Sequence, residues 1–253
     1  MPQALVINPN TSITMSASIR VAAEKVFDSP WSCRVVNAPA GPESLESWRD
    51  YSFASMAVIP LLSEYQNVNG IVLACFGDPG LYTLKEISHV PIVGIAEASI
   101  SMSLLIGGRF GILVGMFRAV QLMDTMVRNY GLGERYAGTR SLDMRVLCFE
   151  EEHERTMAGL EQVGKVLVEQ GADVILLGCA GLSSFVDELT AKLHVPVIDP
   201  VDAGCRMLKT IVESGLNISH AGVYALPACQ RMNNLDQFFN REVLDTFSNW
   251  EKE

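Results

Sequence analysis

Gly70-Ile-Val-Leu-Ala-Cys75-Phe-Gly is an apolar run that ends in cysteine, one further residue and glycine, and the chain repeats it as Val174-Ile-Leu-Leu-Gly-Cys179-Ala-Gly. A second apolar run that begins with proline follows each copy. Pro91-Ile-Val-Gly begins sixteen residues after Cys75, and Pro196-Val-Ile-Asp begins seventeen residues after Cys179. Because several landmarks recur in the same order, the sequence indicates an internal duplication with a period near one hundred residues.

Short apolar runs rich in β-branched residues alternate with longer helical patterns along the whole chain, which is typical of an α/β fold with parallel sheets. The expected strands are Ala4–Asn8, Cys33–Asn37, Gly70–Cys75, Pro91–Ile95, Arg109–Val114, Arg145–Phe149, Asp173–Gly178 and Val195–Asp199. The expected helices are Thr11–Phe27 with Asn10 or Thr11 as its cap, Ser47–Tyr65 interrupted by Pro60, a helix from Pro79, Met116–Tyr130, Glu150–Gln170, a helix from about Ser183, and Ala203–Ser214. We therefore predict two similar lobes, each with a central, mainly parallel sheet flanked by helices, with a boundary near residues 97–108 and a possible hinge at Gly107-Gly108.

Bulk composition argues against several classes of function. The chain has 253 residues, 49% of them apolar, and a formal charge of −10, which disfavours binding to nucleic acid or to an anionic membrane. We see no apolar run long enough to span a bilayer and no signal peptide pattern, so we expect a cytoplasmic protein. The six cysteines lack the spacing of a zinc site, and we expect free thiols and no metal.

The repeated cysteines stand where open α/β sheets bind ligands, because each directly follows a strand and precedes a helix. Asp78 and Pro79 suit the start of a helix after Cys75, and Ser183-Ser184 suits the start of a helix after Cys179. A helix N-terminus lowers the pKa of a thiol towards neutrality, which suits a general base. Two such sulfurs on opposite sides of a cleft could remove a proton from one face of a stereocentre and return one to the other.

The motifs around these cysteines resemble those of hydantoin racemases, which lie with the allantoin racemases in the aspartate/glutamate racemase superfamily. The resemblance rests on Asn8-Pro9-Asn10-Thr11-Ser12, Cys75-Phe-Gly-Asp-Pro-Gly-Leu and Leu177-Gly-Cys179-Ala-Gly-Leu, and on the runs Pro91–Ala98 and Val195–Val201. It extends from about residue 4 to residue 226.

The resemblance implies a cofactor-independent racemase that inverts the C5 stereocentre of a 5-substituted hydantoin or of allantoin, with Cys75 and Cys179 as the catalytic pair. It implies an active site in the cleft between the lobes and a small cyclic amide or ureide as substrate, and we expect a homo-oligomer. The substrate-binding residues that we carry over or infer are Asn10, Thr11, Ser12, Phe76, Gly77, Phe117, Ala180 and Gly181. Phe117 departs from the family pattern: it could pack against a substituent of the substrate or belong to the core, and we favour the core.

Family members pack their last helices against the first lobe. The resemblance therefore implies a discontinuous first lobe, residues 1–97 with about 211–253, and a second lobe of residues 98–210. Residues 228–253 extend past the family pattern, and their apolar side chains have roughly helical spacing. They could cover a subunit interface or form a solvated surface helix.

Two other kinds of function stay open. One is another reaction of the superfamily, such as amino-acid racemisation, decarboxylation or cis–trans isomerisation. A free amino acid would need partners for its charges, and the apolar stretch Val114-Gly-Met-Phe supplies few of them, which favours a neutral ring. The other is a non-catalytic two-lobe protein that binds a small ligand, for which matched thiols are not needed.

Overall fold

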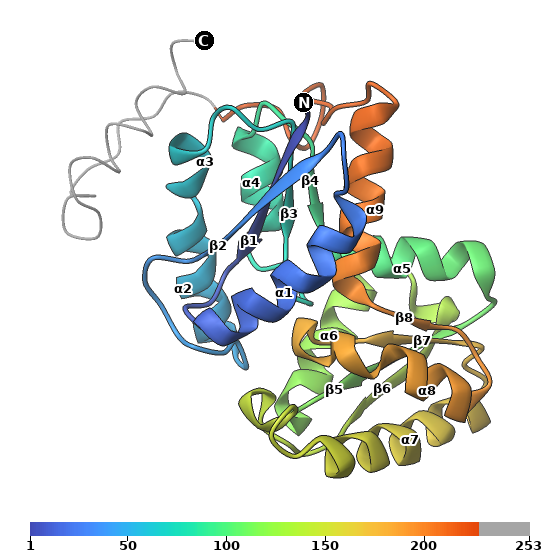
Figure 1. Ribbon diagram of the computed structural model, residues 1–253. Helices are drawn as coiled ribbons and strands as arrows, with labels where there is room; N and C mark the ends of the chain where they lie inside the picture. The colour runs from blue at the N-terminus through green and yellow to red at the C-terminus, as the bar shows by residue number, and fades with distance from the viewer. Residues whose placement is uncertain (228–253) are drawn as a thin grey trace.

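The computed structural model describes residues 1–227 and shows two parallel four-stranded sheets, each flanked by helices (Figure 1). The strands of the first sheet lie in the order β2-β1-β3-β4. Their bounds are β1 Gln3–Asn8, β2 Ser32–Asn37, β3 Gly70–Leu73 and β4 Ile92–Gly94. The helices of this part of the chain are α1 Ile13–Val26, α2 Trp48–Val58, α3 Leu61–Glu64, α4 Leu81–Ile87 and α5 Ile95–Ile106.

The second sheet repeats the topology of the first, with the order β6-β5-β7-β8. Its strands are β5 Phe110–Val114, β6 Tyr136–Ser141, β7 Val174–Leu177 and β8 Val197–Ile198. The helices that follow or separate them are α6 Phe117–Asn129, α7 His153–Glu169, α8 Val186–Leu193 and α9 Pro200–Glu213, with short 3-10 turns η1 Gly133–Arg135, η2 Val146–Cys148 and η3 Ala180–Phe185. The predicted α/β class with two parallel sheets is confirmed.

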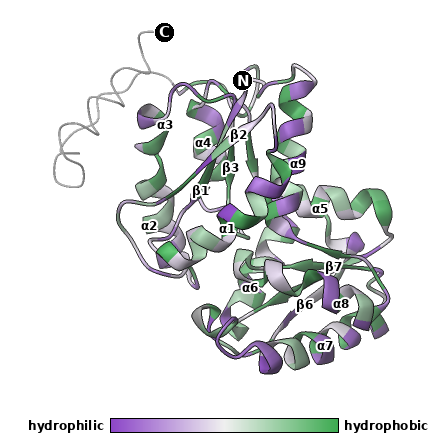
Figure 2. Ribbon diagram, in the orientation of Figure 1, coloured by the Kyte–Doolittle hydropathy of each residue, from purple (hydrophilic) through white to green (hydrophobic). Residues whose placement is uncertain are grey.

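The central strands β3 and β7 explain why the two cysteines occupy matching places. All four residues of each strand are buried, as expected for a strand covered by helices on both faces. β3 pairs with β1 and β7 pairs with β5 in nearly the same register, with Ala4 opposite Gly70 and Phe110 opposite Val174. Figure 2 shows hydrophobic residues along these strands and a mixed outer surface on helices such as α7.

The expected strand Arg145–Phe149 is wrong. The edge strand of the second sheet is β6, Tyr136–Ser141, and residues 146–148 form the turn η2. β6 lies at the sheet edge and has only one buried residue, so it lacks the apolar signal of an interior strand. The apolar character of 145–149 has another cause, because Phe149 is buried in a core cluster and Val146 lines a pocket.

The predicted long helix Ser47–Tyr65 is divided into α2 and α3, with Pro60 at the start of α3. This break agrees with the inability of proline to donate a backbone hydrogen bond inside a helix. No helix within residues 1–227 has the length and apolar character that a bilayer crossing needs.

Helix α9 packs against α1, α5, β3 and β4, and so returns to the first sheet after the second is complete (Figure 1). The close approach to α5 uses Gly204, since a Cβ there would lie 2.8 Å from the side chain of Ile95. The discontinuous first lobe, with the division into 1–97 with 211–253 and 98–210, stays a prediction, and its part 228–253 lies outside the described residues.

Candidate active site

A pocket with about 570 Å³ of empty space, part of it open to solvent, is lined from both lobes and contains both repeated cysteines. Cys75 comes from the end of β3 and Cys179 from the end of β7. The other lining residues are mostly apolar and include the four polar or charged side chains Asn10, Ser44, Glu46 and Tyr51. The remaining lining residues are Met15, Leu45, Ala74, Phe76, Val114, Gly115, Met116, Ala119, Met123, Val146, Gly178 and Ala180.

A tight turn carries Cys75. The amide of Asp78 donates to the Cys75 carbonyl at 3.0 Å, and Gly77 has φ of +119°, a conformation that favours glycine. A Cβ on Gly77 would lie 2.2 Å from the Tyr51 hydroxyl, so glycine is also needed for space. The Tyr51 hydroxyl donates to the Phe76 carbonyl at 3.2 Å and thereby holds the turn against α2.

The expectation that Asp78 and Pro79 begin the helix after Cys75 is wrong. α4 begins at Leu81, and Gly80 precedes it in a left-handed conformation. The Asp78 carboxylate instead accepts the amides of Ala96 and Glu97 at 3.0 and 2.8 Å and so caps α5. The local sequence identified a capping residue, but only the tertiary structure shows which helix it caps.

Cys179 directly precedes η3 and occupies its N-cap position. A backbone hydrogen bond from Gly181 reaches the Cys179 thiol and by itself favours the thiolate, as expected for a sulfur at the start of a helical turn. Ser183 donates to the Ala180 carbonyl at 3.0 Å and to the Asp199 carboxylate at 2.9 Å. These contacts tie the turn after Cys179 to the start of α9.

Burial is the largest influence on the pKa of both thiols, and at Cys179 it outweighs the backbone hydrogen bond from Gly181. It raises the pKa of Cys179 to about 11, and it raises the pKa of Cys75 well above its ordinary value. The negative charge of Glu46 adds to the rise at Cys179, and a charge on Cys179 adds to the rise at Cys75. The expected lowering towards neutrality is therefore wrong, because desolvation disfavours a thiolate.

Three of the predicted substrate-binding residues line the pocket: Asn10, Phe76 and Ala180. Asn10 is buried, and its side chain is held by internal contacts. Its Oδ1 accepts from Asn8 Nδ2 and from the Ser12 amide, both at 2.9 Å. Its Nδ2 lies 3.0 Å from Met15 Sδ, which also lines the pocket. The role of these residues in binding a substrate stays a prediction.

The remaining predicted contacts lie outside the pocket lining. Ser12, rather than Asn10 or Thr11, is the N-cap of α1 and accepts the Met15 amide at 3.2 Å, while the Thr11 hydroxyl donates to the Gly41 carbonyl. Gly77 and Gly181 lie in the turns behind the cysteines. Phe117 is 66% exposed at the start of α6, so its interpretation as a core residue is wrong.

Sequence reasoning missed Ser44, Glu46 and Tyr51. Ser44 donates to Glu46 Oε1 at 3.0 Å, and both belong to the loop before α2. Burial raises the pKa of Tyr51 well above its ordinary value, and a negative charge on Cys75, Asp78 or Cys179 would add to the rise, so Tyr51 is a neutral phenol near both sulfurs. None of the three belongs to a repeated motif, so the spacing of the sequence carried no signal for them.

The residues of the pocket do not form a metal site. Within residues 1–227 there is no group of three or more histidine, cysteine, aspartate or glutamate side chains placed to hold a metal ion. The pocket offers two thiols from opposite lobes, a few hydrogen-bonding groups and an apolar wall. This arrangement can bind a small molecule between two potential proton donors or acceptors.

Comparisons with known proteins identify the family of the chain. A family model described as Asp/Glu/Hydantoin racemase matches residues 5–208. The hydantoin racemase of Pseudomonas sp. (strain NS671) is 38% identical over 225 residues, covering 88% of this chain and 90% of that protein. The hydantoin racemase of Paenarthrobacter aurescens is 36% identical over 227 residues, covering 88% of this chain and 96% of that protein.

A solved structure agrees with the sequence relatives. The allantoin racemase from Klebsiella pneumoniae has a TM-score of 0.86 and 33% identity, covering 94% of this chain and 98% of that chain. The predicted family and the predicted class of enzyme are thus confirmed. The chain belongs to the Asp/Glu/hydantoin racemase family and is an isomerase of the racemase type.

Proposed function

We propose that the protein racemises 5-monosubstituted hydantoins by proton transfer between Cys75 and Cys179, with no cofactor. The observation that carries the proposal is that one pocket contains both sulfurs, each delivered from the central strand of a different lobe. A substrate ring between them has one sulfur available to each face of C5.

The reaction needs one thiolate and one thiol. The thiolate takes the C5 proton, and the electron pair of the broken C–H bond moves into the neighbouring carbonyl to give an enolate. The opposite thiol then gives its proton to the other face of C5, so the charge moves from one sulfur to the other and no atom is gained or lost. Since a charge on Cys179 raises the pKa of Cys75, ionisation of one sulfur favours the protonated form of its partner.

Peptide groups and a few side chains would hold the ring. Hydantoin carries N–H donors and carbonyl acceptors, and the pocket offers the Glu46 carboxylate as an acceptor and the turns after the two cysteines as sources of backbone amides. An amide aimed at the developing enolate oxygen stabilises the transition state more than the ground state.

The apolar wall favours a hydantoin with an apolar substituent over allantoin. Val114, Met116, Ala119, Met123 and Val146 line the pocket on the side of the second lobe. The ureido group of allantoin would lose hydrogen bonds to water against such a wall, whereas an alkyl or aromatic group would gain from burial.

The same lining disfavours a free amino acid. Among the described residues, no lysine or arginine side chain lines the pocket, so the carboxylate of an aspartate or glutamate substrate would have no cationic partner there. Racemisation of a neutral ring therefore fits this pocket better than the amino-acid reaction of the superfamily.

The decisive experiment follows the optical activity of each enantiomer of 5-benzylhydantoin and of allantoin in heavy water. We expect loss of rotation and incorporation of deuterium at C5, faster for 5-benzylhydantoin. Replacement of Cys75 or Cys179 by serine should abolish racemisation, while Cys148→Ser, a part-exposed cysteine that does not line the pocket, should keep full activity. Full activity in either pocket variant would refute the two-cysteine reaction. Binding without turnover in the unmodified protein would favour the non-catalytic alternative.

A further inference from the structure

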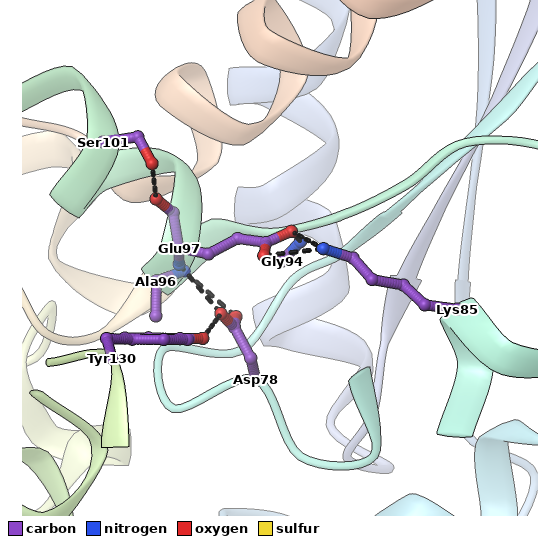
Figure 3. A network of polar contacts seen from close by, with 7 residues as sticks. All are labelled: Asp78, Lys85, Gly94, Ala96, Glu97, Ser101 and Tyr130. Carbon is purple, nitrogen blue, oxygen red and sulfur yellow. Dashed lines mark hydrogen bonds and ion pairs between the residues drawn. The ribbon is translucent and has the colours of Figure 1, made fainter. Parts of the chain in front are cut away.

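Asp78 lies in the turn that carries Cys75, and its buried carboxylate joins three parts of the molecule (Figure 3). It accepts the amides of Ala96 and Glu97 at the start of α5, and the hydroxyl of Tyr130 donates to it at 3.2 Å. The carboxylate fills the space of a missing side chain, since a Cβ on Gly94 would lie 2.3 Å from Asp78 Cγ.

The corresponding helix of the second lobe, α9, is capped by its own N-cap residue and not by a residue of the cysteine turn. Asp199 occupies the place that Gly94 has in the first lobe, directly before a helix, and caps α9 itself through the amide of Val201 at 2.8 Å. There a serine of the turn after Cys179 reaches out to the capping carboxylate. In the first lobe the capping carboxylate, that of Asp78, comes from the turn that carries Cys75, so its hydrogen bonds tie this turn directly to α5.

The hydrogen bond from Tyr130 to Asp78 adds a contact between the two lobes. Tyr130 is the C-cap of α6, and the N-cap of the same helix, Met116, lines the pocket together with Ala119 and Met123 of its first half. The amide of Asp78 also donates to the Cys75 carbonyl at 3.0 Å. A continuous chain of contacts therefore runs from the wall of the second lobe through Tyr130 and Asp78 to Cys75.

The helix that receives the carboxylate is itself held in place. Glu97 accepts the amide of Gly94 at 3.1 Å and pairs with Lys85 of α4 at 2.7 Å (Figure 3). These two contacts of Glu97 hold the first turn of α5 in place, so the Asp78 carboxylate that accepts its amides also has a fixed position. Asp78 is anchored at α5, and its third partner, Tyr130, comes from the other lobe.

We infer that Asp78 and Tyr130 are positioning residues, which set the place of the Cys75 sulfur relative to the pocket wall of the second lobe. This inference rests on the proposed two-cysteine reaction. Neither residue transfers a proton in it. Loss of the Tyr130 hydroxyl leaves the α5 cap intact but removes the hydrogen bond that joins Asp78 to the end of α6, and a small displacement of a catalytic group slows proton transfer strongly.

The test compares Tyr130→Phe with Tyr136→Phe. Tyr136 belongs to the same lobe, is also half-buried, and its hydroxyl bonds to Asp124 on α6 and Thr139 on β6; none of these three residues lines the pocket. We expect kcat of Tyr130→Phe to fall by about tenfold with little change in KM, and Tyr136→Phe to keep the kcat of the unmodified protein.

Isotope effects separate a positioning role from a general loss of folded protein. With C5-deuterated substrate, the isotope effect on kcat/KM of Tyr130→Phe should rise for the enantiomer that Cys75 deprotonates, because this step becomes limiting. It should approach one for the other enantiomer, because reprotonation by Cys75 then limits the rate. A smaller folded fraction changes neither ratio. Asp78→Asn, which keeps one oxygen acceptor, should shift the two isotope effects in the same directions.

The outcomes distinguish the two claims. Absence of racemisation and of C5 exchange in the unmodified protein would refute the proposed function. If the unmodified protein racemises but Tyr130→Phe and Asp78→Asn show the same isotope effects as Tyr136→Phe, the positioning role is overturned and the two-cysteine reaction stands.

Discussion

The ionisation of Cys179 can be measured directly by varying pH in the substrate-free protein. Its pKa of about 11 reflects burial, which outweighs the backbone hydrogen bond from Gly181. Only the thiolate reacts with an alkylating agent such as iodoacetamide. The rate of alkylation as a function of pH therefore reports the population of the charged sulfur.

The magnitude follows from the two pKa values. An ordinary thiol with a pKa of 9.0 would have about a hundredfold more thiolate at pH 7 than Cys179 has with its pKa of about 11. The alkylation rate of Cys179 should increase about tenfold for each pH unit up to about pH 10. In the unfolded chain the same residue should level off near pH 9, where an ordinary thiol is half ionised.

Alkylation is quenched at set times, the protein is digested, and the labelled peptide that contains Cys179 is quantified by mass spectrometry. The unfolded protein in denaturant is the matched control, because it contains the same peptide without burial. The slope with pH is the measured quantity, since restricted access lowers the rate equally at every pH. A rate that levels off below pH 8 in the folded protein would refute the reasoning and restore the expectation of a thiol primed by a helix start.

Three further predictions follow from the surroundings of Asp78 and from the surface of α6. Burial and the charge of Glu97 raise the Asp78 pKa from 3.8 to about 7, so the folded state holds a proton that the unfolded state releases, and this stabilisation is present at low pH and lost as the pH rises through 7. The unfolding free energy of the unmodified protein relative to Asp78→Asn should be about 2.5 kcal/mol larger at pH 5 than at pH 8 in urea titrations, and equal differences at both pH values would contradict the shift. Gly94→Ala places a methyl group on the Asp78 carboxylate and should cost about 2 kcal/mol or more in the same titrations, whereas Gly133→Ala, with open space around it, should be neutral. Phe117→Ser should leave kcat/KM within about twofold, because this side chain is exposed and outside the pocket lining, and a tenfold loss would show that it meets the substrate.

Local patterns in the sequence were sufficient for much of the architecture. A strand that is buried on both faces has a continuous apolar run in its sequence. The strands β3 and β7 and the cysteines that follow them could therefore be predicted from the sequence. The edge strand β6 could not be found in this way, because a half-exposed strand has no continuous apolar run. The apolar residues around Phe149 belong to a turn whose side chains are part of the core and of the pocket lining.

The candidate site was accessible to sequence reasoning only where it is repeated. Cys75 and Cys179 recur in matching places, and the structure brings them to one pocket. Glu46 and Tyr51 have no counterpart in a motif, and they reach the pocket because the loop before α2 and the first turn of that helix fold over the end of the first sheet.

By itself the sequence determined the alternation of strands and helices, the duplication and the pair of cysteines, because each depends on residues that are neighbours along the chain. The tertiary structure alone decided which helix Asp78 caps, which hydroxyl reaches it from the other lobe, and in which direction the thiol pKa values shift. Capping partners and desolvation depend on what packs around a group, and in this protein the packing comes from segments that are far apart in sequence.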